Sequence, residues 1–171
     1  MKKTLTKGRK ALYAVSAVLL ALVLIVCGYL CYVVFSYSRI EDKQVLTIAN
    51  TGEEKALETD TEYSAYIQNI GFGAYTADFT FFMDGGEKSW AESEESVVEC
   101  INKGIGEAKK YDADFILFQE VDFDSTRSYH TDQHKMITDA FPSYASVFAV
   151  NYDSAFLMYP LTEPHGASRA G

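Results

Sequence analysis

The chain has 171 residues, three cysteines and a formal net charge of −9. Only Cys100 lies beyond residue 35, so a disulfide-stapled exported domain is excluded. Residues 1–35 carry five basic and no acidic side chains, whereas the remainder carries 10 basic and 24 acidic residues, a net charge of −14. Such an acidic part argues against a broad basic surface for nucleic acid, although a local basic patch stays open.

Residues 11–35 form a run of 25 residues without a charged side chain, "ALYAVSAVLLALVLIVCGYLCYVVF". At about 1.5 Å per residue, a helix of this length spans the hydrocarbon core of a bilayer. A cleaved signal peptide is the alternative, but it has a shorter apolar core followed by a small-residue cleavage site, and no A-x-A follows here. We therefore predict a transmembrane signal anchor over 11–35.

The charges that flank this span predict its orientation. Residues 1–10 are basic and carry no acid, whereas the segment after Phe35 is nearly neutral. The positive-inside rule then places residues 1–10 in the cytoplasm and the acidic part outside it. We expect a single-pass protein of the cell membrane.

Residues 36–62 are predicted to form a linker and a first strand, with the strand at 44–50 and a polar loop at 51–62. Residues 63–70 alternate loosely as a strand that ends at Asn69, and the turn "GFG" follows. After a long loop rich in Phe, a helix is expected from Trp90, because Ser89 and Glu92 have the spacing of a capping box. One apolar stripe marks its buried face: Val97, Ile101, Ile105 and Ala108.

The stretch "DADFILFQEVD" places four apolar residues before Gln119 and Glu120. A short continuous apolar run predicts a strand that is covered on both faces. The order of strand, helix and strand over 63–120 predicts a βαβ crossover, in which both strands end at the same edge of the sheet. Asn69 and Glu120 should then face each other at that edge, where α/β proteins usually bind ligands.

The sequence signals for the remaining elements are weaker. Thr131 is expected to cap a second helix, which Pro142 stops. Residues 144–150 are expected to form a strand, and residues 158–171 a loop. The buried face of the second helix is predicted to hold Met136, Ile137, Ala140 and Phe141.

Five motifs in order resemble the endonuclease/exonuclease/phosphatase superfamily, which includes DNase I-like nucleases, inositol polyphosphate phosphatases and neutral sphingomyelinases. They are "IQNIGFG", "DFILFQEVD", "DSTRSYHTDQ", "FAVNYD" and "YPLTEPHG". The later three look like a membrane-anchored bacterial branch. The resemblance covers residues 63–171, and it implies an α/β fold in which these residues form the first half of a two-sheet, DNase I-like sandwich.

The resemblance also implies a hydrolase of phosphate esters that uses Mg²⁺ or Mn²⁺, with Glu120 as the metal ligand and Asn69 orienting the phosphate. Mg²⁺ prefers oxygen ligands and binds through one or two carboxylates together with water and substrate phosphate. Arg127, Tyr129 and Asn151 fall within the later motifs and are candidate phosphate-binding donors. Two plainer interpretations stay open: Asn69 as the closing residue of a strand, and Arg127 as a surface partner of Asp122 or Asp124.

The chain departs from this family in its catalytic base. Family members activate water with a C-terminal His in an S-D-H-like motif and carry an Asp-x-Asn pair before it, and neither is present. His130, His134 and His165 do not occur in that context, and His134 is expected to be exposed.

The sequence also stops before the second sheet of the family fold, so one face of the strand at 115–118 would lack a partner. We therefore expect a truncated front half that is weakly folded and inactive by itself. The alternative is a non-catalytic, membrane-tethered binding or vestigial protein. Expected partners are the bilayer and a phosphate ester, which could be a phospholipid, a nucleic acid or a small phosphodiester, and no stable protein partner is expected.

Overall fold

A computed structural model describes residues 6–49 and 56–171 of the chain. These residues divide into two compact units, one that ends at Tyr37 and one that begins at Ser38. The predicted loop at 51–62 lies partly outside the described residues, and its described part, from Ala56 on, contains no helix or strand.

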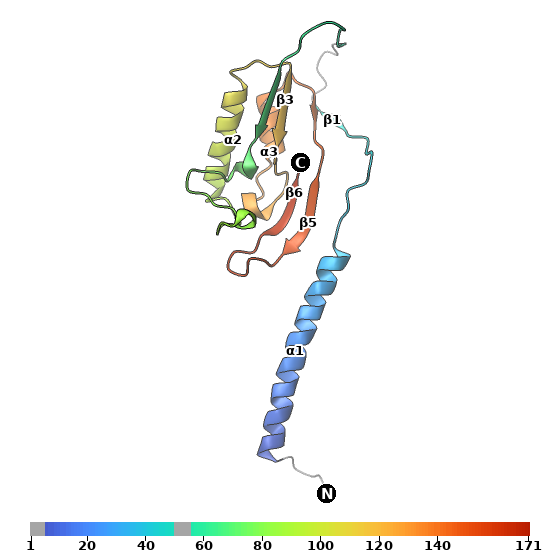
Figure 1. Ribbon diagram of the computed structural model, residues 1–171, viewed down its shortest axis with the longest axis vertical. Helices are drawn as coiled ribbons and strands as arrows, with labels where there is room; N and C mark the ends of the chain where they lie inside the picture. The colour runs from blue at the N-terminus through green and yellow to red at the C-terminus, as the bar shows by residue number, and fades with distance from the viewer. Residues whose placement is uncertain (1–5, 50–55) are drawn as a thin grey trace. The chain divides into compact units, whose positions relative to one another are not determined.

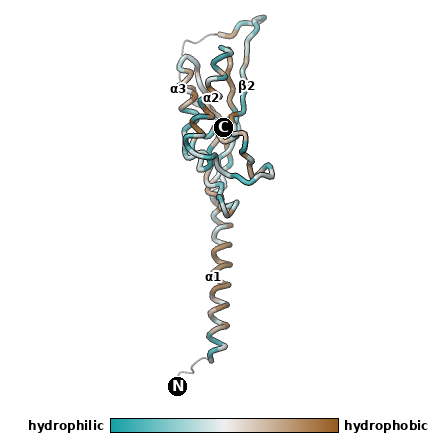
Figure 2. The backbone as a smooth tube through the Cα atoms, turned by 90° about the vertical axis from the view of Figure 1, so that its left-hand side faces the viewer, coloured by the Kyte–Doolittle hydropathy of each residue, from teal (hydrophilic) through white to brown (hydrophobic). Residues whose placement is uncertain are grey.

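The first unit is a single helix, α1 (Lys7–Phe35), of 29 residues. It is long and apolar enough to cross a membrane, as predicted for 11–35. Beyond its basic first turn, apolar residues occur on every side of the helix, and the tube of α1 in Figure 2 is brown along most of its length and teal at its N-terminal end. A helix that is apolar all round is typical of a membrane span or of the core of a large protein, and not of the surface of a soluble domain.

The second unit is built around a βαβ crossover (Figure 1). Strands β2 (Ala65–Asn69) and β3 (Phe115–Gln119) pair in parallel, with Asn69 opposite Gln119, and α2 (Glu94–Ala108) connects them. This is the predicted order. It brings the carboxyl ends of both strands to one edge, beside the segment that follows β2.

Helix α2 begins later than predicted. Its N-cap is Ser93, whose hydroxyl accepts a hydrogen bond from the Ser96 N–H at 3.1 Å. The predicted cap, Ser89, is buried, and its N–H donates to Glu163. The Ala91 N–H donates to the Arg127 carbonyl at 2.9 Å, so tertiary contacts hold this segment outside the helix.

The predicted apolar stripe of α2 is confirmed, since all four residues are buried. The core also includes the turn after β2 and Ala91, three residues before α2, and α3 (Gln133–Ala140) packs against it with the side chains that were predicted for its buried face. The N-cap of α3 is Asp132, not Thr131, because the Asp132 carboxylate accepts from the Lys135 N–H at 2.8 Å. The core residues are Phe72, Ala74, Ala91, Val97, Ile101 and Ile105.

The prediction that β3 is covered on both faces is wrong for this chain. Phe115 and Leu117 are 42% and 48% exposed, whereas the alternate residues Ile116 and Phe118 are half-buried. Ile67 of β2 lies on the exposed face as well. This is the face that we expected to lack a partner, and α2 and α3 cover the other one.

Two short strands, β1 (Ile48–Ala49) and β4 (Ser146–Val147), pair antiparallel. They fall within the predicted strands at 44–50 and 144–150 but are much shorter, and residue 50 lies outside the described residues.

The C-terminal segment is only partly the predicted loop: residues 158–165 contain no helix or strand, but residues 166–170 form a strand. β5 (Tyr152–Leu157) and β6 (Gly166–Ala170) form an antiparallel hairpin. Val121 and Gly171 exchange two backbone hydrogen bonds of 2.9 and 3.0 Å, so the hairpin joins the chain just beyond β3. The described part of the chain is thus a mixed α/β fold with small sheets.

Candidate metal and phosphate site

Asn69 and Glu120 meet at the shared edge of β2 and β3. The amide nitrogen of Asn69 donates to Oε1 of Glu120 at 2.8 Å, and both side chains are exposed. Asn69 ends β2, and Glu120 follows directly after β3. The juxtaposition predicted from the βαβ order is therefore present, and it follows from the parallel register.

Backbone contacts fix the pair. The carbonyl of Glu120 accepts from the Phe72 N–H at 2.9 Å, and the carbonyl of Gln119 accepts from the Ile70 N–H at 3.0 Å. Glu120 itself has φ 57°, in the left-handed region that residues with a side chain seldom occupy. Backbone strain of this kind persists only where the surroundings enforce it, and it gathers at functional sites.

Gly71 and Tyr75 complete the edge. The Gly71 N–H donates to Oδ1 of Asn69 at 2.8 Å, so both ends of that amide are engaged. Gly71 has φ +50°, and a Cβ on it would lie 2.3 Å from Cδ2 of Tyr75. Burial raises the pKa of the Tyr75 phenol first, and the hydrogen bond to Asp84 and the charges of Asp84 and Glu120 raise it further.

The pair lines an open hollow of about 720 Å³ between the strand ends and α2. Polar side chains and the Tyr75 ring share its walls. The lining residues are Gln68, Asn69, Ile70, Gly71, Tyr75, Cys100, Lys103, Gly104, Glu107 and Glu120.

Within residues 6–49 and 56–171, no cluster of three or more His, Cys, Asp or Glu side chains could hold a metal ion. A hydrated Mg²⁺ does not require such a cluster, because it keeps several waters and often takes only one or two carboxylates. The exposed carboxylate of Glu120 fits that mode. Asn69 fits the role of a group that orients this carboxylate and donates N–H, because its oxygen already accepts from Gly71.

The structure places Arg127 in the domain interior. Its Nε and Nη2 donate to the two carboxylate oxygens of Asp122 at 3.1 and 2.8 Å, and its guanidinium carbon lies 3.9 Å from the centre of the Phe72 ring. Of the two interpretations, the pairing with Asp122 is therefore present, but the pair is buried and not at the surface. Arg127 supports the turn that carries Phe72.

Tyr129 and Asn151 lie apart from the Asn69–Glu120 pair. The Tyr129 hydroxyl lies 3.1 Å from the Ala91 carbonyl, and its ring meets Trp90 edge to face. Asn151 is exposed just before β5, and its N–H donates to the carbonyl of β6 at Ala170. It therefore lies two strand spacings, about 10 Å, from the chain that follows Glu120.

The three histidines occupy different surroundings. His130 is exposed and pairs with Asp124 at 2.5 Å, whereas His134 is half-buried against Phe148, so the expectation that His134 is exposed is wrong. His165 is only 1% exposed, and desolvation, followed by the nearby Arg127 charge, lowers its pKa to about 4. Sequence reasoning missed His165 and Tyr75 as features of this region, because both lie in loops, where no sequence period indicates the burial of His165 or the contact of Tyr75 with Gly71 and Asp84.

No family model, curated protein or solved structure matches the chain.

Proposed function

We propose that the chain carries the metal-binding and phosphate-binding edge of a membrane-anchored phosphoesterase of the endonuclease/exonuclease/phosphatase type. The observation that carries the proposal is the 2.8 Å contact between Asn69 and Glu120 at the common end of two parallel strands, with Glu120 held on a left-handed backbone. A strand-end Asn and the Glu of a Gln-Glu pair are the positions that the resemblance assigns to phosphate and metal.

The two side chains would have different roles. Glu120 binds a hydrated Mg²⁺ or Mn²⁺ through its exposed carboxylate, and Asn69 orients both this carboxylate and the phosphate. A bound divalent ion stabilises negative charge on phosphoryl oxygens and on the leaving group. Gly71 holds the Asn69 amide in place through its backbone N–H.

We propose that the N-terminus is cytoplasmic and that the acidic domain lies outside the membrane, because Lys7, Arg9 and Lys10 precede the apolar run and no acid does. The substrate class is a phosphodiester or phosphomonoester. The net charge of −14 beyond residue 35 favours a phospholipid or a small phosphodiester over a nucleic acid.

A non-catalytic, tethered binding protein is the second candidate. The observation that favours it is the exposed apolar face of the β2–β3 pair, where Ile67, Phe115 and Leu117 are 62%, 42% and 48% exposed. Faces of this kind often mark binding sites. Such a protein would bind without a divalent ion, which separates it from the first candidate.

A phosphate probe tests the proposal. The full chain in detergent micelles is loaded with Mn²⁺, and the ³¹P relaxation rate of dimethyl phosphate is measured. We expect the wild-type chain to increase this rate several-fold above Mn²⁺ in buffer with micelles alone. Asn69→Ala should retain Mn²⁺ but lose most of the increase, because the phosphate is no longer oriented.

Asn102→Ala is the matched control, since Asn102 is an exposed amide on α2 that should not affect the phosphate. Relaxation by the wild-type chain equal to that of Mn²⁺ with empty micelles would overturn the proposal. Equal losses in Asn69→Ala and Asn102→Ala would remove Asn69 from the site.

A further inference from the structure

Three large apolar side chains project from two neighbouring loops of the domain. Met83 of η2 (Phe82–Asp84) is 57% exposed, and Tyr159 and Leu161 are 69% and 81% exposed. The rings of Phe82 and Tyr159 lie 5.9 Å apart, so the two loops touch. We call Met83, Tyr159 and Leu161 the apolar rim.

Hydrogen bonds hold these loops in place. The Phe82 N–H donates to the Lys88 carbonyl at 2.9 Å, and the Trp90 indole N–H donates to the Pro164 carbonyl at 2.7 Å. The His165 N–H donates to the Tyr159 carbonyl at 3.1 Å. The backbone of both loops is therefore fixed by hydrogen bonds. The three apolar side chains stay in water, although packing against the core would bury them.

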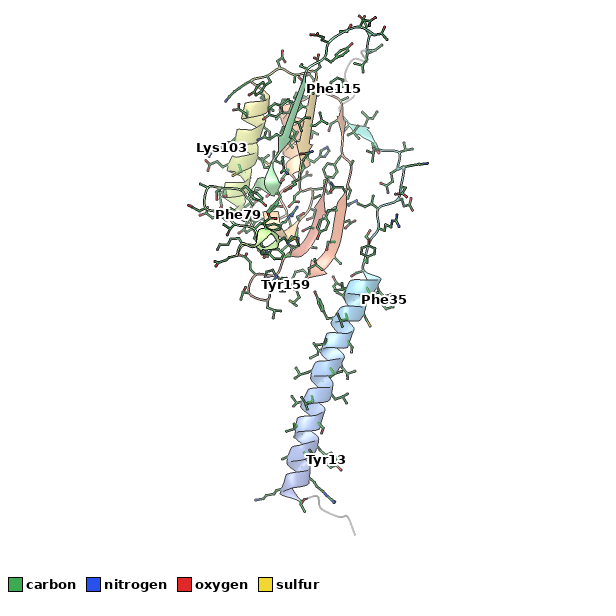
Figure 3. All side chains as sticks on the ribbon, in the orientation of Figure 1. Tyr13, Phe35, Phe79, Lys103, Phe115 and Tyr159 are labelled. Carbon is green, nitrogen blue, oxygen red and sulfur yellow. The ribbon has the colours of Figure 1, made fainter. Side chains whose placement is uncertain are left out.

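The rim and the candidate site share one end of the domain. Tyr75 lines the hollow beside Glu120, and its hydroxyl contacts Asp84, the residue after Met83, at 3.2 Å. Figure 3 shows Tyr159 and Phe79 at this end and Phe115 at the opposite end of the domain. A surface that bound the rim would therefore lie at the same end of the domain as the Asn69–Glu120 edge.

The tether keeps the domain close to a bilayer. α1 ends at Phe35, and β1 begins at Ile48, where it pairs with β4 of the domain. The segment 36–47 between them spans at most about 40 Å when fully extended. That reach is comparable with the diameter of a domain of this size, so one surface of the domain is always within contact distance of the headgroups.

The chemistry of the rim suits a lipid interface. Tyrosine prefers the headgroup level, where its ring is buried and its hydroxyl stays wet, and Met and Leu supply apolar area. The neighbouring charges are of both signs, and most are acidic, which favours zwitterionic over anionic lipid. They are Asp84, Glu87, Lys88 and Glu163.

We propose that the apolar rim inserts into the headgroup layer of the membrane that α1 spans and so turns the Asn69–Glu120 edge toward the lipid surface. This inference depends on α1 as a membrane anchor and not on metal chemistry. The exposed face of β2–β3 is the rival surface. It lines a hollow of about 770 Å³ together with side chains of α3 and β4. Insertion would bring the backbone polar groups along its open strand edges toward hydrocarbon, which costs free energy.

Site-directed fluorescence tests the inference in the full chain. With Cys27, Cys31 and Cys100 replaced by Ser, the chain carrying Leu161→Cys is labelled with an environment-sensitive dye and reconstituted into phosphatidylcholine vesicles. We expect blue-shifted emission and strong quenching by lipids brominated near the headgroup. Leu117→Cys, on the sheet face, is the matched control and should not be quenched by these lipids.

Aqueous emission and no quenching at position 161 would overturn the inference, and so would stronger quenching at 117 than at 161. Glu120→Gln in the labelled chain should leave the quenching unchanged. A wild-type chain that shows the quenching but binds no Mn²⁺ would refute the proposed function alone, and one that binds Mn²⁺ but shows no quenching would refute the lipid contact alone.

Discussion

Glu120 holds a backbone conformation that its side chain does not favour. A left-handed residue with a Cβ costs about 1–2 kcal/mol relative to a right-handed one. Here the Phe72 N–H and the Asn69 amide both bind Glu120, at 2.9 and 2.8 Å, and they offset this cost. The result is a carboxylate that is fixed in direction although it is exposed.

The turn at Gly71 is the most sensitive point of this arrangement. Gly71→Ala should destabilise the domain by about 1–3 kcal/mol, because it forces a Cβ against the Tyr75 ring at a positive φ of 50°. Urea unfolding in detergent micelles measures the change. Trp90 is the only tryptophan, so its fluorescence reports on the domain and not on α1.

Gly106→Ala is the control for this substitution. A Cβ on Gly106 would meet nothing within 4 Å, and Gly106 lies inside α2, so alanine should leave stability unchanged or raise it by up to about 1 kcal/mol. Equal unfolding midpoints for Gly71→Ala and wild type would contradict the account of this turn.

The sequence allowed the Asn69–Glu120 pair to be predicted because strand ends follow from short apolar runs and parallel strands share an edge. It did not allow the burial of Arg127 to be predicted. The Arg127 side chain is buried because it packs against the Phe72 ring and pairs with the Asp122 carboxylate. Phe72 and Asp122 are distant in the sequence, and only the βαβ crossover between them brings them together.

The βαβ element could be predicted because its sequence patterns are local. The four-residue stripe of α2 and the apolar run of β3 are local, so each indicates its own structure. β6 was missed because "GASRA" has neither alternation nor bulky residues. It is a strand because β5 and the chain at Val121 and Asp122 pair with it on both sides, and such pairing is set by distant residues.

The buried pair of Asp122 and Arg127 joins the end of β3 to η3 (Thr126–Ser128). Asp122 also accepts from the Ser128 hydroxyl at 2.7 Å, and its N–H donates to the side chain of Gln133 at 3.0 Å. Gln133 in turn donates to the Phe72 carbonyl at 2.8 Å. This network connects three elements to the turn beneath the candidate site.

Arg127→Met should therefore cost about 3–5 kcal/mol, because it leaves the Asp122 carboxylate buried without its partner. The measurement is again the urea midpoint from Trp90 fluorescence. Arg169→Met is the matched control, since Arg169 is exposed. Similar midpoints for the two variants would show that the buried pair adds nothing to stability.

At the scale of the whole domain, the buried core is small and one sheet face is open, so individual buried groups matter. His165 is such a group: it is 1% exposed, its Nδ1 has no hydrogen-bond partner, and Arg127 and Asp122 are the charges that act on it. Its folded pKa of about 4 lies below the ordinary value of 6.5. The folded state therefore favours the neutral ring.

Protonation of the unfolded chain should consequently destabilise the domain as the pH falls from about 6.5 to about 4, by about 3 kcal/mol in total. Below that range, the His165 contribution levels off because both states are protonated. Urea unfolding at several pH values measures the slope. His165→Gln should flatten it over this range, and an unchanged slope would show that other groups cause the acid sensitivity.

The proposed function requires that Glu120 binds a divalent cation. The most direct test is Mn²⁺ binding to the full chain in detergent micelles, followed by the electron paramagnetic resonance signal of free Mn²⁺. We predict binding to the wild type and to Glu107→Gln, whose carboxylate lines the same hollow but pairs with Lys110, and at least tenfold weaker binding to Glu120→Gln. Equal Mn²⁺ affinities for wild type and Glu120→Gln would contradict the account.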